Sequence, residues 1–246
     1  MEKIKNPPKL MHSTYFNLGT SNSPEIIGLY MAKARECLSE SEGMISFWIG
    51  TRAQDMVRPE NDLKYDIAMH QLFKDKASFD LYNTNDTTHS EFVVYVNKLV
   101  PGATRRVMDA YVTNLIIGGN LSEAQHIGTD GNFPQSLFHD LYFSLTDKSE
   151  KNIKSFTDIC LKYLSGHPGI QQFSTGGLTD INRDVSVRNF DVAVSIIYES
   201  KKAYDTYLKS KKHDEFFPAT AGMIENTYIF DSYLKYESKV YSLTRF

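Results

Sequence analysis

The sequence predicts an α+β protein in which two ferredoxin-like βαββαβ repeats pack sheet to sheet into one intramolecular α+β barrel. The first observation is that the chain contains two collinear copies of one pattern. The offset between matched residues falls only from 127 (His12 and His139) to 122 (Asp109 and Asp231), as small deletions would cause. The second is that both copies have the same order of strand-like and helix-like segments. A sheet with helices on one face must also cover the other, and two copies in one chain can cover each other.

The copies divide the 246-residue chain into repeats at 9–113 and 136–236. The linker between them, 114–135, is rich in Gly and Asn, which is typical of a loop. An apolar run at 115–117 inside the linker could form a short strand. A tail follows the second repeat at 237–246.

The first strand and the first helix of each repeat have clear signals. Residues 12–18 alternate within a β-rich run, which predicts a strand. Ser23 is then a candidate N-cap, Pro24 suits the first helical position, and apolar residues recur at helical spacing as far as Leu38. The second copy repeats this pattern from Ser149 onward.

Two strands, a second helix and a last strand complete each repeat. Gly43 and Gly169 end the helical segments, where a left-handed turn requires glycine. The polar stretches 51–64 and 177–189 are long for hairpin loops, and we expect them on the surface. Only a short connecting segment is expected before each last strand. The other segments are strands at 44–50, 65–73 and 105–112 with a helix at 76–83, and strands at 170–176, 190–198 and 226–234 with a helix at 201–210.

Composition and charge exclude several classes of protein. A 41% hydrophobic fraction supports a sizeable core, and a net charge of -3 gives no general attraction to nucleic acid. Cys37 and Cys160 lie in separate amphipathic segments, so a disulfide framework is not expected. No apolar stretch reaches the roughly 18 residues of a membrane helix, and the N-terminal segment lacks a secretory signal. These features favour a cytoplasmic protein that binds neither nucleic acid nor membrane.

Several spaced residues resemble the stress-responsive A/B barrel family, also called Dabb domains. They are a His on the first strand, a helix ending at Gly, a Tyr-x5-His pair and the closing run "IFDSYL" at 229–234. The resemblance covers both repeats. It implies the dimeric α+β barrel, completed here within one chain instead of by two subunits. It also implies a small-molecule ligand, because the relatives best understood by activity are plant polyketide cyclases, which close an aromatic ring by intramolecular aldol chemistry without metal or organic cofactor.

The resemblance also implies which residues form the site. In each repeat these are the first-strand His, the Tyr and His of the Tyr-x5-His pair, and the Asp of the last strand. They are His139, Tyr207, His213 and Asp231 in the second repeat, and His12, Tyr82, His89 and Asp109 in the first. The first repeat departs from the pattern because one extra residue separates its Tyr from its His.

Residue chemistry then suggests roles for the second repeat. We expect His213 to act as general base or acid and Tyr207 to donate a hydrogen bond to a developing oxyanion. Asp231 would orient the imidazole, and His139 would supply a second polar contact. A scaffold interpretation remains open, because residues present in both repeats can also serve the fold.

Three functions are compatible with these residues. The first is a cofactor-independent lyase or cyclase that acts on a small, partly apolar carbonyl compound. The second is a stress-related protein that binds a small ligand without turnover. The third is a cofactor-free monooxygenase. A cavity lined by Tyr207 and His213 would favour the first and third, and solid packing around His213 would favour the second.

Metal binding has weaker support in the sequence. His12, His89 and Asp109 could form a site of two histidines and one carboxylate, but they come from widely separated segments. No phosphate-binding loop, Cys-x-x-Cys pair or Gly-x-Ser-x-Gly elbow occurs. We therefore expect no metal and no cofactor. The histidines without a counterpart in the other repeat are expected to be solvated or structural; they are His70, His126 and His167.

Overall fold

The computed structural model describes residues 2–3, 10–117, 136–181 and 183–239. This part of the chain contains ten strands and six α-helices. In chain order they are β1 (Glu2–Lys3), β2 (Leu10–Asn17), α1 (Pro24–Leu38), β3 (Met44–Arg52), β4 (Ile67–Phe73), α2 (Lys76–Asn85), α3 (Thr87–Leu99), β5 (Thr104–Ala110), β6 (Asn114–Ile117), β7 (Leu137–Leu145), α4 (Glu150–Leu164), β8 (Ile170–Gly177), β9 (Val192–Tyr198), α5 (Lys201–Leu208), α6 (Lys211–Ala219) and β10 (Ile224–Lys239).

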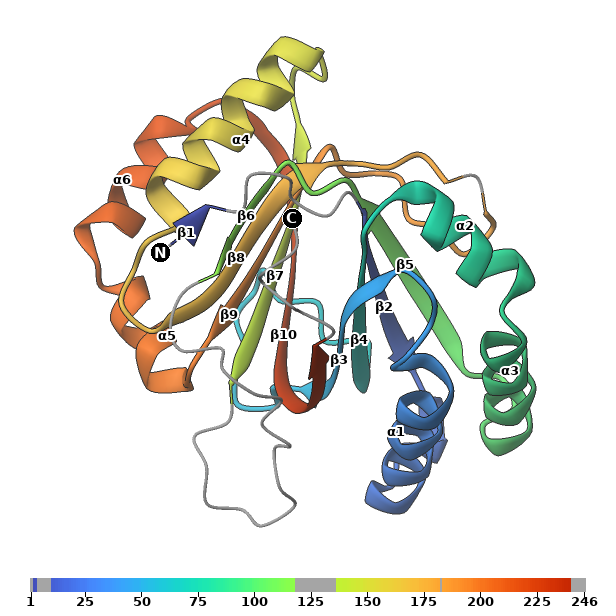
Figure 1. Ribbon diagram of the computed structural model, residues 1–246. Coiled ribbons are helices and arrows are strands. Elements are labelled where there is room, and N and C mark those ends of the chain that lie inside the picture. The colour runs from blue at the N-terminus through green and yellow to red at the C-terminus, as the bar shows by residue number, and fades with distance from the viewer. Residues whose placement is uncertain (1, 4–9, 118–135, 182, 240–246) are drawn as a thin grey trace.

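The strands form one sheet in the order β1-β6-β8-β9-β7-β10-β3-β4-β2-β5. The first half contributes β5-β2-β4-β3 and the second half contributes β8-β9-β7-β10, which is the same ferredoxin-like order in each. Helices α1, α2 and α3 cover the first half on one side of the molecule, and α4, α5 and α6 cover the second half on the other (Figure 1). The duplicated α+β fold expected from the sequence is confirmed.

Two seams join the halves and close the sheet into a barrel. At one seam, β10 pairs with β7 and then continues along β3 of the first half. At the other, β5 pairs with β2, and β6 continues along β8 of the second half. Between β5 and β6, the Tyr111 amide donates to the Gly177 carbonyl at 2.8 Å, and the Thr113 amide donates to the Thr175 carbonyl at 3.0 Å. At the end of each half, the chain therefore continues as a strand that pairs with the sheet of the other half.

Glycine is required where the seams approach most closely. A Cβ atom at Gly176 would overlap the Tyr111 carbonyl, and one at Gly50 would overlap the Tyr233 carbonyl. Gly50 and Gly176 occupy equivalent positions in the two repeats, so the repeated glycine serves closure of the barrel. Their neighbour Gly177 has no such close contact.

Helix starts follow the sequence signals. The Ser23 hydroxyl accepts from the Ile26 amide at 3.3 Å, and the Ser149 hydroxyl accepts from the Asn152 amide at 3.3 Å. Gly43 and Gly169 have φ values of 74° and 81°. They lie in the turns that lead into β3 and β8, a few residues after the helices have ended, so their left-handed backbone serves the strand entry.

Two helices replace the short segments expected before the last strands. Asp86 caps α3 by accepting from the Thr88 and His89 amides at 2.8 and 3.0 Å, and Ser210 caps α6 by accepting from the His213 amide at 3.2 Å. Phe92 of α3 is buried with its ring 5.4 Å from the Tyr30 ring of α1, and Phe216 of α6 is buried with its ring 6.2 Å from the Phe156 ring of α4. The sequence interpretation missed both helices because each follows the previous one after one or two residues.

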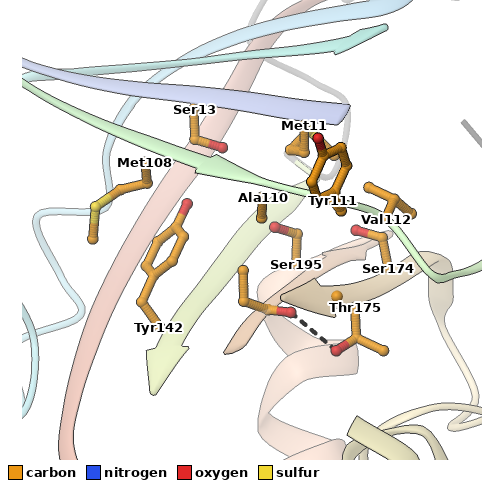
Figure 2. A pocket seen from close by; sticks show the side chains of 12 residues that line it. Met11, Ser13, Met108, Ala110, Tyr111, Val112, Tyr142, Ser174, Thr175 and Ser195 are labelled. Carbon is orange, nitrogen blue, oxygen red and sulfur yellow. Dashed lines mark hydrogen bonds between the residues drawn. The ribbon is translucent and has the colours of Figure 1, made fainter. Parts of the chain in front are cut away.

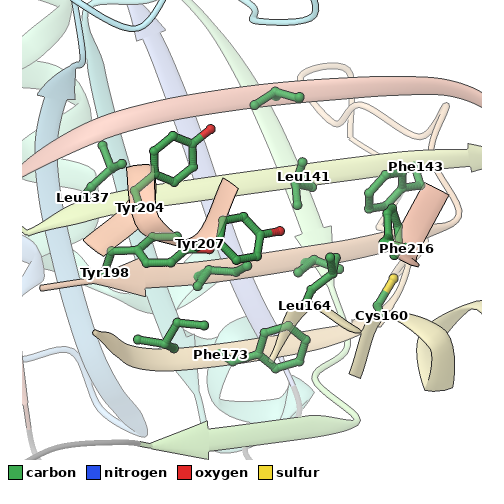
Figure 3. Close-up of a cluster of buried hydrophobic side chains, with 14 of the residues drawn as sticks. Leu137, Leu141, Phe143, Cys160, Leu164, Phe173, Tyr198, Tyr204, Tyr207 and Phe216 are labelled. Carbon is green, nitrogen blue, oxygen red and sulfur yellow. The ribbon is translucent and has the colours of Figure 1, made fainter. Parts of the chain in front are cut away.

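The core has separate layers outside and inside the barrel. In the second half, apolar side chains from β7, β8 and β9 pack against α4, α5 and α6 (Figure 3). An equivalent layer lies under α1, α2 and α3. Inside the barrel, aromatic side chains from both halves meet, and the rings of Tyr15 and Phe230 stack at 3.8 Å. Cys37 and Cys160 are both free and buried.

Two strands extend into the segments predicted as linker and tail. The apolar run at 115–117 lies within β6, and β10 continues to Lys239, past the predicted end of the second repeat. The rest of the predicted linker and of the tail lies outside the described residues. Among the described helices, none combines the length and apolar character needed to cross a membrane.

Candidate functional site

The first-strand histidines lie between the sheet and the helices, outside the barrel interior. Side chains alternate along a strand, so His139 shares a face with Leu141 and Phe143, which pack under the second half's helices. The His139 ring lies 5.1 Å from the Tyr204 ring of α5. In the first half, the His12 ring lies 5.2 Å from the Phe79 ring of α2. The two histidines therefore occupy equivalent layers in the two halves.

The candidate residues of the second repeat form what we call the second site, and those of the first repeat form the first site. The second site is built on a His–Asp pair. His139 of β7 and Asp231 of β10 are register partners, and His139 Nδ1 lies 2.5 Å from Asp231 Oδ1. Both residues are buried. Burial by itself raises the pKa of the Asp231 carboxyl, but interactions with His139 and Arg58 outweigh burial, so the pKa is lower than its usual value. Asp231 is therefore ionised at neutral pH and binds the ring of His139.

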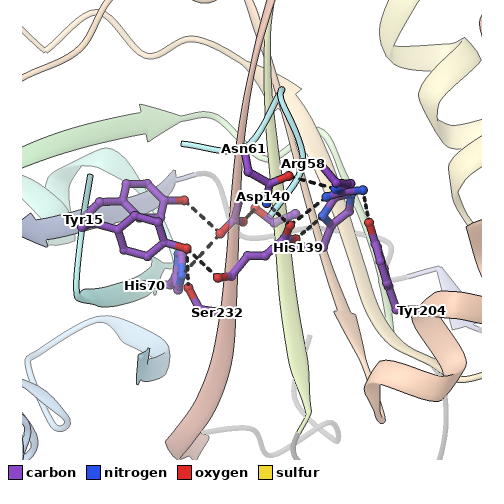
Figure 4. A network of polar contacts seen from close by, with 11 residues as sticks. Tyr15, Arg58, Asn61, His70, His139, Asp140, Tyr204 and Ser232 are labelled. Atoms are coloured by element: carbon purple, nitrogen blue, oxygen red, sulfur yellow. Dashed lines mark hydrogen bonds and ion pairs between the residues drawn. The ribbon is translucent and has the colours of Figure 1, made fainter. Parts of the chain in front are cut away.

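Arg58 completes this site from the other half of the chain. Its Nη2 lies 2.7 Å from Asp231 Oδ2, and its Nη1 donates to the Tyr204 hydroxyl. Asn61 donates from Nδ2 to the same Asp231 oxygen at 2.5 Å and accepts from Arg58 Nε at 2.8 Å. Figure 4 shows Arg58 between Tyr204 and His139. A charged network thus joins the loop after β3 to strands of the second half.

The first site has the same arrangement, with the contributions of the two halves exchanged. His12 Nδ1 lies 2.6 Å from Asp109 Oδ1, and Arg183 Nη2 lies 2.5 Å from Asp109 Oδ2. Arg183 comes from the loop after β8, and its Nη1 donates to Asn83 Oδ1 at 2.9 Å. Ser186 accepts from Arg183 Nε at 3.2 Å. Each half therefore supplies the arginine for the other half's His–Asp pair.

The two Tyr–His pairs lie at helix junctions. Tyr207 of α5 and His213 of α6 have ring centroids 4.8 Å apart, and those of Tyr82 and His89 are 4.4 Å apart. Burial lowers the pKa of His213, and burial followed by the electrostatic interaction with His12 lowers the pKa of His89 to about 4. Both histidines are therefore neutral at neutral pH. His213 Nδ1 is buried and has no hydrogen-bond partner among the described residues.

The candidate residues of the second repeat form two groups that share neighbours. Tyr207 lies 6.1 Å from Tyr204 and 5.3 Å from Tyr198 by ring centroids, and His139 also contacts both of these rings. Burial raises the pKa of Tyr207, so its hydroxyl keeps its proton. The sequence interpretation assigned Asp231 to orient His213. The structure pairs it with His139, because these two residues face each other across neighbouring strands while His213 lies on a helix.

The sequence interpretation missed the two arginines and placed their loops on the surface. The loop at 51–64 is bound to β10, since the Ala53 amide donates to the Asp231 carbonyl at 2.8 Å. Ala53 and Met56 are buried in the core of the second half. A signal was available, because Arg58 and Arg183 are separated by 125 residues, the offset of the surrounding segments.

The histidines without counterparts have structural settings where they are described. The His167 ring nitrogen Nε2 contacts the Tyr163 carbonyl at 2.9 Å. His70 lies inside the barrel, stacked on Phe138 at 4.0 Å, with Nε2 3.5 Å from Asp140 Oδ2. His126 lies outside the described residues. No group of three or more His, Cys, Asp or Glu side chains in the described ranges is placed to hold a metal ion.

Asp140 is the centre of a second polar cluster, inside the barrel. It accepts hydrogen bonds from the Tyr15 hydroxyl at 2.9 Å and from the Ser195 hydroxyl at 2.6 Å. Burial raises the pKa of Asp140 to about 8, and burial followed by the electrostatic interaction with His12 lowers the pKa of His70 to about 3. The cluster is separated from His139 by the backbone of β7, since successive side chains of a strand point to opposite faces.

Neither of two hollows formed by described residues borders Tyr207 or His213, so neither supplies the cavity that would favour the enzymatic functions. One is a cavity of about 10 Å³ at the seam between β5 and β8, lined by residues that include Ser13, Tyr142 and Ser195 (Figure 2). That volume suits one water molecule. The other is an open depression along the exposed face of α4.

Comparisons with known proteins agree with this architecture. No curated protein matches the sequence. A Fusobacterium nucleatum structure provisionally named a monooxygenase has a TM-score of 0.66 and 10% identity, covering 95% of each chain. A structure of the same provisional name from Lactobacillus acidophilus NCFM has a TM-score of 0.63 and 15% identity, covering 94% of this chain and 96% of the other. An anthrone oxidase-like protein has a TM-score of 0.61 and 11% identity, covering 97% and 96%. At these identities, the likeness establishes the fold across both halves.

The family comparison identifies the second half. Residues 137–234 match the model of the stress responsive A/B barrel domain. This range runs from β7 to β10 and contains His139, Arg183, Tyr207, His213 and Asp231. Its counterpart in the first half has the same strand order, the same helix positions and an equivalent His–Asp–Arg network. The second half therefore matches the stress responsive A/B barrel domain, and the first half shares its architecture.

Proposed function

We propose that this protein is a cofactor-independent enzyme that moves a proton at a carbon next to a carbonyl group, in a small, partly apolar compound bound at the second site. One observation carries the proposal. Asp231 binds His139 Nδ1 at 2.5 Å, and among the described residues no hydrogen bond is made to His139 Nε2. A carboxylate in this position keeps the proton on Nδ1, so Nε2 has a free electron pair.

The aromatic side chains supply the remaining parts of such a reaction. His139 Nε2 would take the proton from carbon, and the electron pair of the broken C–H bond would form an enolate. Tyr207 keeps its hydroxyl proton because burial raises its pKa, so it can donate a hydrogen bond to the enolate oxygen. In a cyclase, the enolate carbon would then attack a second carbonyl carbon of the same substrate and form a carbon–carbon bond, and the proton held by His139 would pass to the resulting alkoxide oxygen. A lyase would run the reverse: His139 would take the proton of a β-hydroxyl group as the carbon–carbon bond breaks, and would return it to the enolate carbon.

A second candidate function is a cofactor-free monooxygenase. The whole-chain neighbours from Fusobacterium nucleatum and Lactobacillus acidophilus carry that provisional name, and the third neighbour is called anthrone oxidase-like. The same first step would serve, since removal of a proton yields an electron-rich carbanion that can react with oxygen. The two candidates differ in whether oxygen is consumed.

Proton exchange tests the proposal before the natural substrate is known. We would incubate the full chain with aryl-substituted methyl ketones in deuterated buffer and follow deuterium incorporation next to the carbonyl by mass spectrometry. We expect exchange above the buffer rate in the wild type and a loss of about 10²–10⁴-fold in His139→Gln. Oxygen uptake, measured in parallel, separates the two candidates.

Two variants show where the activity resides. His12→Gln changes the equivalent residue of the first site and should lower the exchange rate less than His139→Gln. Exchange that survives in His139→Gln but disappears in His12→Gln would contradict our assignment. Binding of the ketones without any exchange would instead support the ligand-binding alternative.

A further inference from the structure

The two arginines occupy matched positions on opposite sides of the barrel. Arg58 lies in the loop after β3 of the first half, and Arg183 lies in the equivalent loop after β8 of the second half. Each guanidinium reaches a carboxylate of the opposite half, Asp231 or Asp109. This ion pair between the halves occurs twice, so it follows from the way the two halves are assembled.

The loops that carry the arginines are held by the opposite half. The Ala53 amide donates to the Asp231 carbonyl at 2.8 Å, and the Thr179 amide donates to the Asp109 carbonyl at 3.0 Å. Farther along, the Asp62 amide donates to the Ile229 carbonyl, as the Val187 amide does to the Val107 carbonyl, both at 2.8 Å. These backbone bonds place each arginine beside a last strand of the other half.

Side-chain contacts then fix the orientation of each guanidinium. Arg58 lies 5.5 Å from the centroid of the Tyr204 ring, and Arg183 lies 5.2 Å from that of Phe79. Nε of each arginine donates to a side chain three residues further along its own loop, Asn61 or Ser186. An arginine held in this way can bind a carboxylate with defined geometry, which a lysine cannot reproduce.

We propose that Arg58 and Arg183 are positioning residues that act across the two halves: each arginine holds the carboxylate of the opposite half in place, so that this carboxylate orients its histidine. Each His–Asp pair is thus competent only when the other half's loop is seated against it. The activity part of this inference depends on the proposed function, whereas the structural part does not.

Charge explains why the arginine matters to the histidine. Asp231 is shared between a permanent cation, Arg58, and an imidazole that can gain or lose a proton. If the guanidinium is removed, the carboxylate has only His139 to neutralise it, and the protonated imidazolium is favoured. A protonated ring has no free electron pair at Nε2 and cannot accept a proton. The arginine therefore favours the neutral form that a general base requires.

Reciprocal variants of the full chain test this inference. We would compare Arg58→Met with Arg183→Met and record the ring ¹⁵N signals of the histidines by NMR at neutral pH. We expect Arg58→Met to move the signals of His139 toward those of imidazolium and to leave His12 unchanged. Arg183→Met should do the reverse. A purely local role of either arginine would disturb the histidine of its own half instead.

Further variants keep the test decisive if the methionine variants fold poorly, because removal of one partner of a buried ion pair is costly. Arg58→Lys and Arg183→Lys keep the charge but lose the forked geometry, so each should show a smaller change in the same crossed pattern. Thermal unfolding identifies which variants are folded. Signals that move in both sites or in neither, in folded variants, would overturn the inference.

Proton exchange adds a measurement tied to function. Arg58→Met should lower the exchange rate by about 10–100-fold, as loss of an outer hydrogen-bond partner typically does. If the wild type exchanges no protons but the crossed NMR pattern is found, the positioning inference stands and the proposed function fails. If the wild type exchanges protons and the histidine signals do not respond to the arginines, the function stands and the positioning inference fails.

Discussion

The two sites have the same charged frame and different surroundings. Both contain a first-strand His, a last-strand Asp and an Arg from the opposite half, with Nδ1–Oδ1 distances of 2.6 and 2.5 Å. Around this frame, Phe79 in the first site corresponds to Tyr204 in the second. Arg183 donates from Nη1 to Asn83, and Arg58 donates from Nη1 to the Tyr204 hydroxyl.

The difference separates what the fold requires from what a site can vary. The charged frame lies where the last strand of one half meets the loop of the other, so closure of the barrel places it twice. The Tyr–His pairs lie at helix junctions that can lengthen by a residue without disturbing the barrel, as between Tyr82 and His89. Retention of a residue in both halves therefore shows that the fold places that position twice, and the differences between the halves show where the two sites diverge.

The largest expected effect comes from replacing the carboxylate that each site contains. Asp231→Asn removes the charge that binds His139 and leaves Arg58 without its carboxylate partner, so the proton-exchange rate should fall by about 10²–10⁴-fold. Asp109→Asn should cause a smaller loss, because the second site is the one we assign to turnover. Equal losses in the two variants would show that the sites are functionally equivalent.

A second prediction compares the two seams. Gly176→Ala places a methyl group against the Tyr111 carbonyl, and Gly50→Ala places one against the Tyr233 carbonyl. Overpacking of this kind typically costs about 1–3 kcal/mol. We expect both variants to lose stability in urea unfolding, with Gly176→Ala affected more because its contact is closer. Gly177→Ala is the matched control and should be tolerated better, since no atom lies closer than 3.7 Å to the added methyl group. Wild-type stability in both seam variants would contradict the closed barrel.

A third prediction uses the asymmetry inside the barrel, where Asp140 corresponds to Ser13 of the first half. The pKa of Asp140 is raised in the folded state to about 8 from its usual value of 3.8. Its contribution to the free energy of unfolding is therefore fully present below pH 3.8 and is lost as the pH rises to about 8. The pKa of His70 is lowered from 6.5 to about 3, so its contribution is present above pH 6.5 and is lost as the pH falls to about 3.

These opposite dependences leave one window in which Asp140 acts alone. Between pH 6.5 and about 8, the free energy of unfolding should fall by about 1.4 kcal/mol per pH unit, or about 2 kcal/mol in all. Urea unfolding across this range measures the change. Asp140→Asn cannot ionise and should show little dependence on pH in the same window. A slope that persists unchanged in this variant would assign the effect to other groups.

The smallest expected effect concerns the junctions that carry the second histidines. Asp86→Ala removes the cap of α3 next to His89, and Ser210→Ala removes the cap of α6 next to His213. Loss of an N-cap typically costs about 1 kcal/mol. We expect a comparable decrease in thermal stability for each. A local rise in amide hydrogen exchange, confined to the first turn of the affected helix, would locate the change, and exchange spread across the barrel would argue against a local cap.

Much of the fold could be predicted because its signals are local. Ser23 and Ser149 cap their helices as the sequence indicates, and the strands follow the apolar runs closely. Helices α3 and α6 could not be separated from their predecessors, because a cap after one or two residues leaves no loop to mark the break. The candidate His and Asp residues were named by family resemblance, and no local pattern indicated that Asp231 faces His139.

The sequence by itself determined the duplicated ferredoxin-like order, since offset, periodicity and helix caps are properties of neighbouring residues. Only the tertiary structure decided which half completes which site. Arg58 and Asp231 are 173 residues apart and meet because the last strand of one half pairs with the second strand of the other. The physical reason is that a ferredoxin-like sheet has open edges and one uncovered face, and closing them within one chain brings each loop arginine beside the opposite carboxylate.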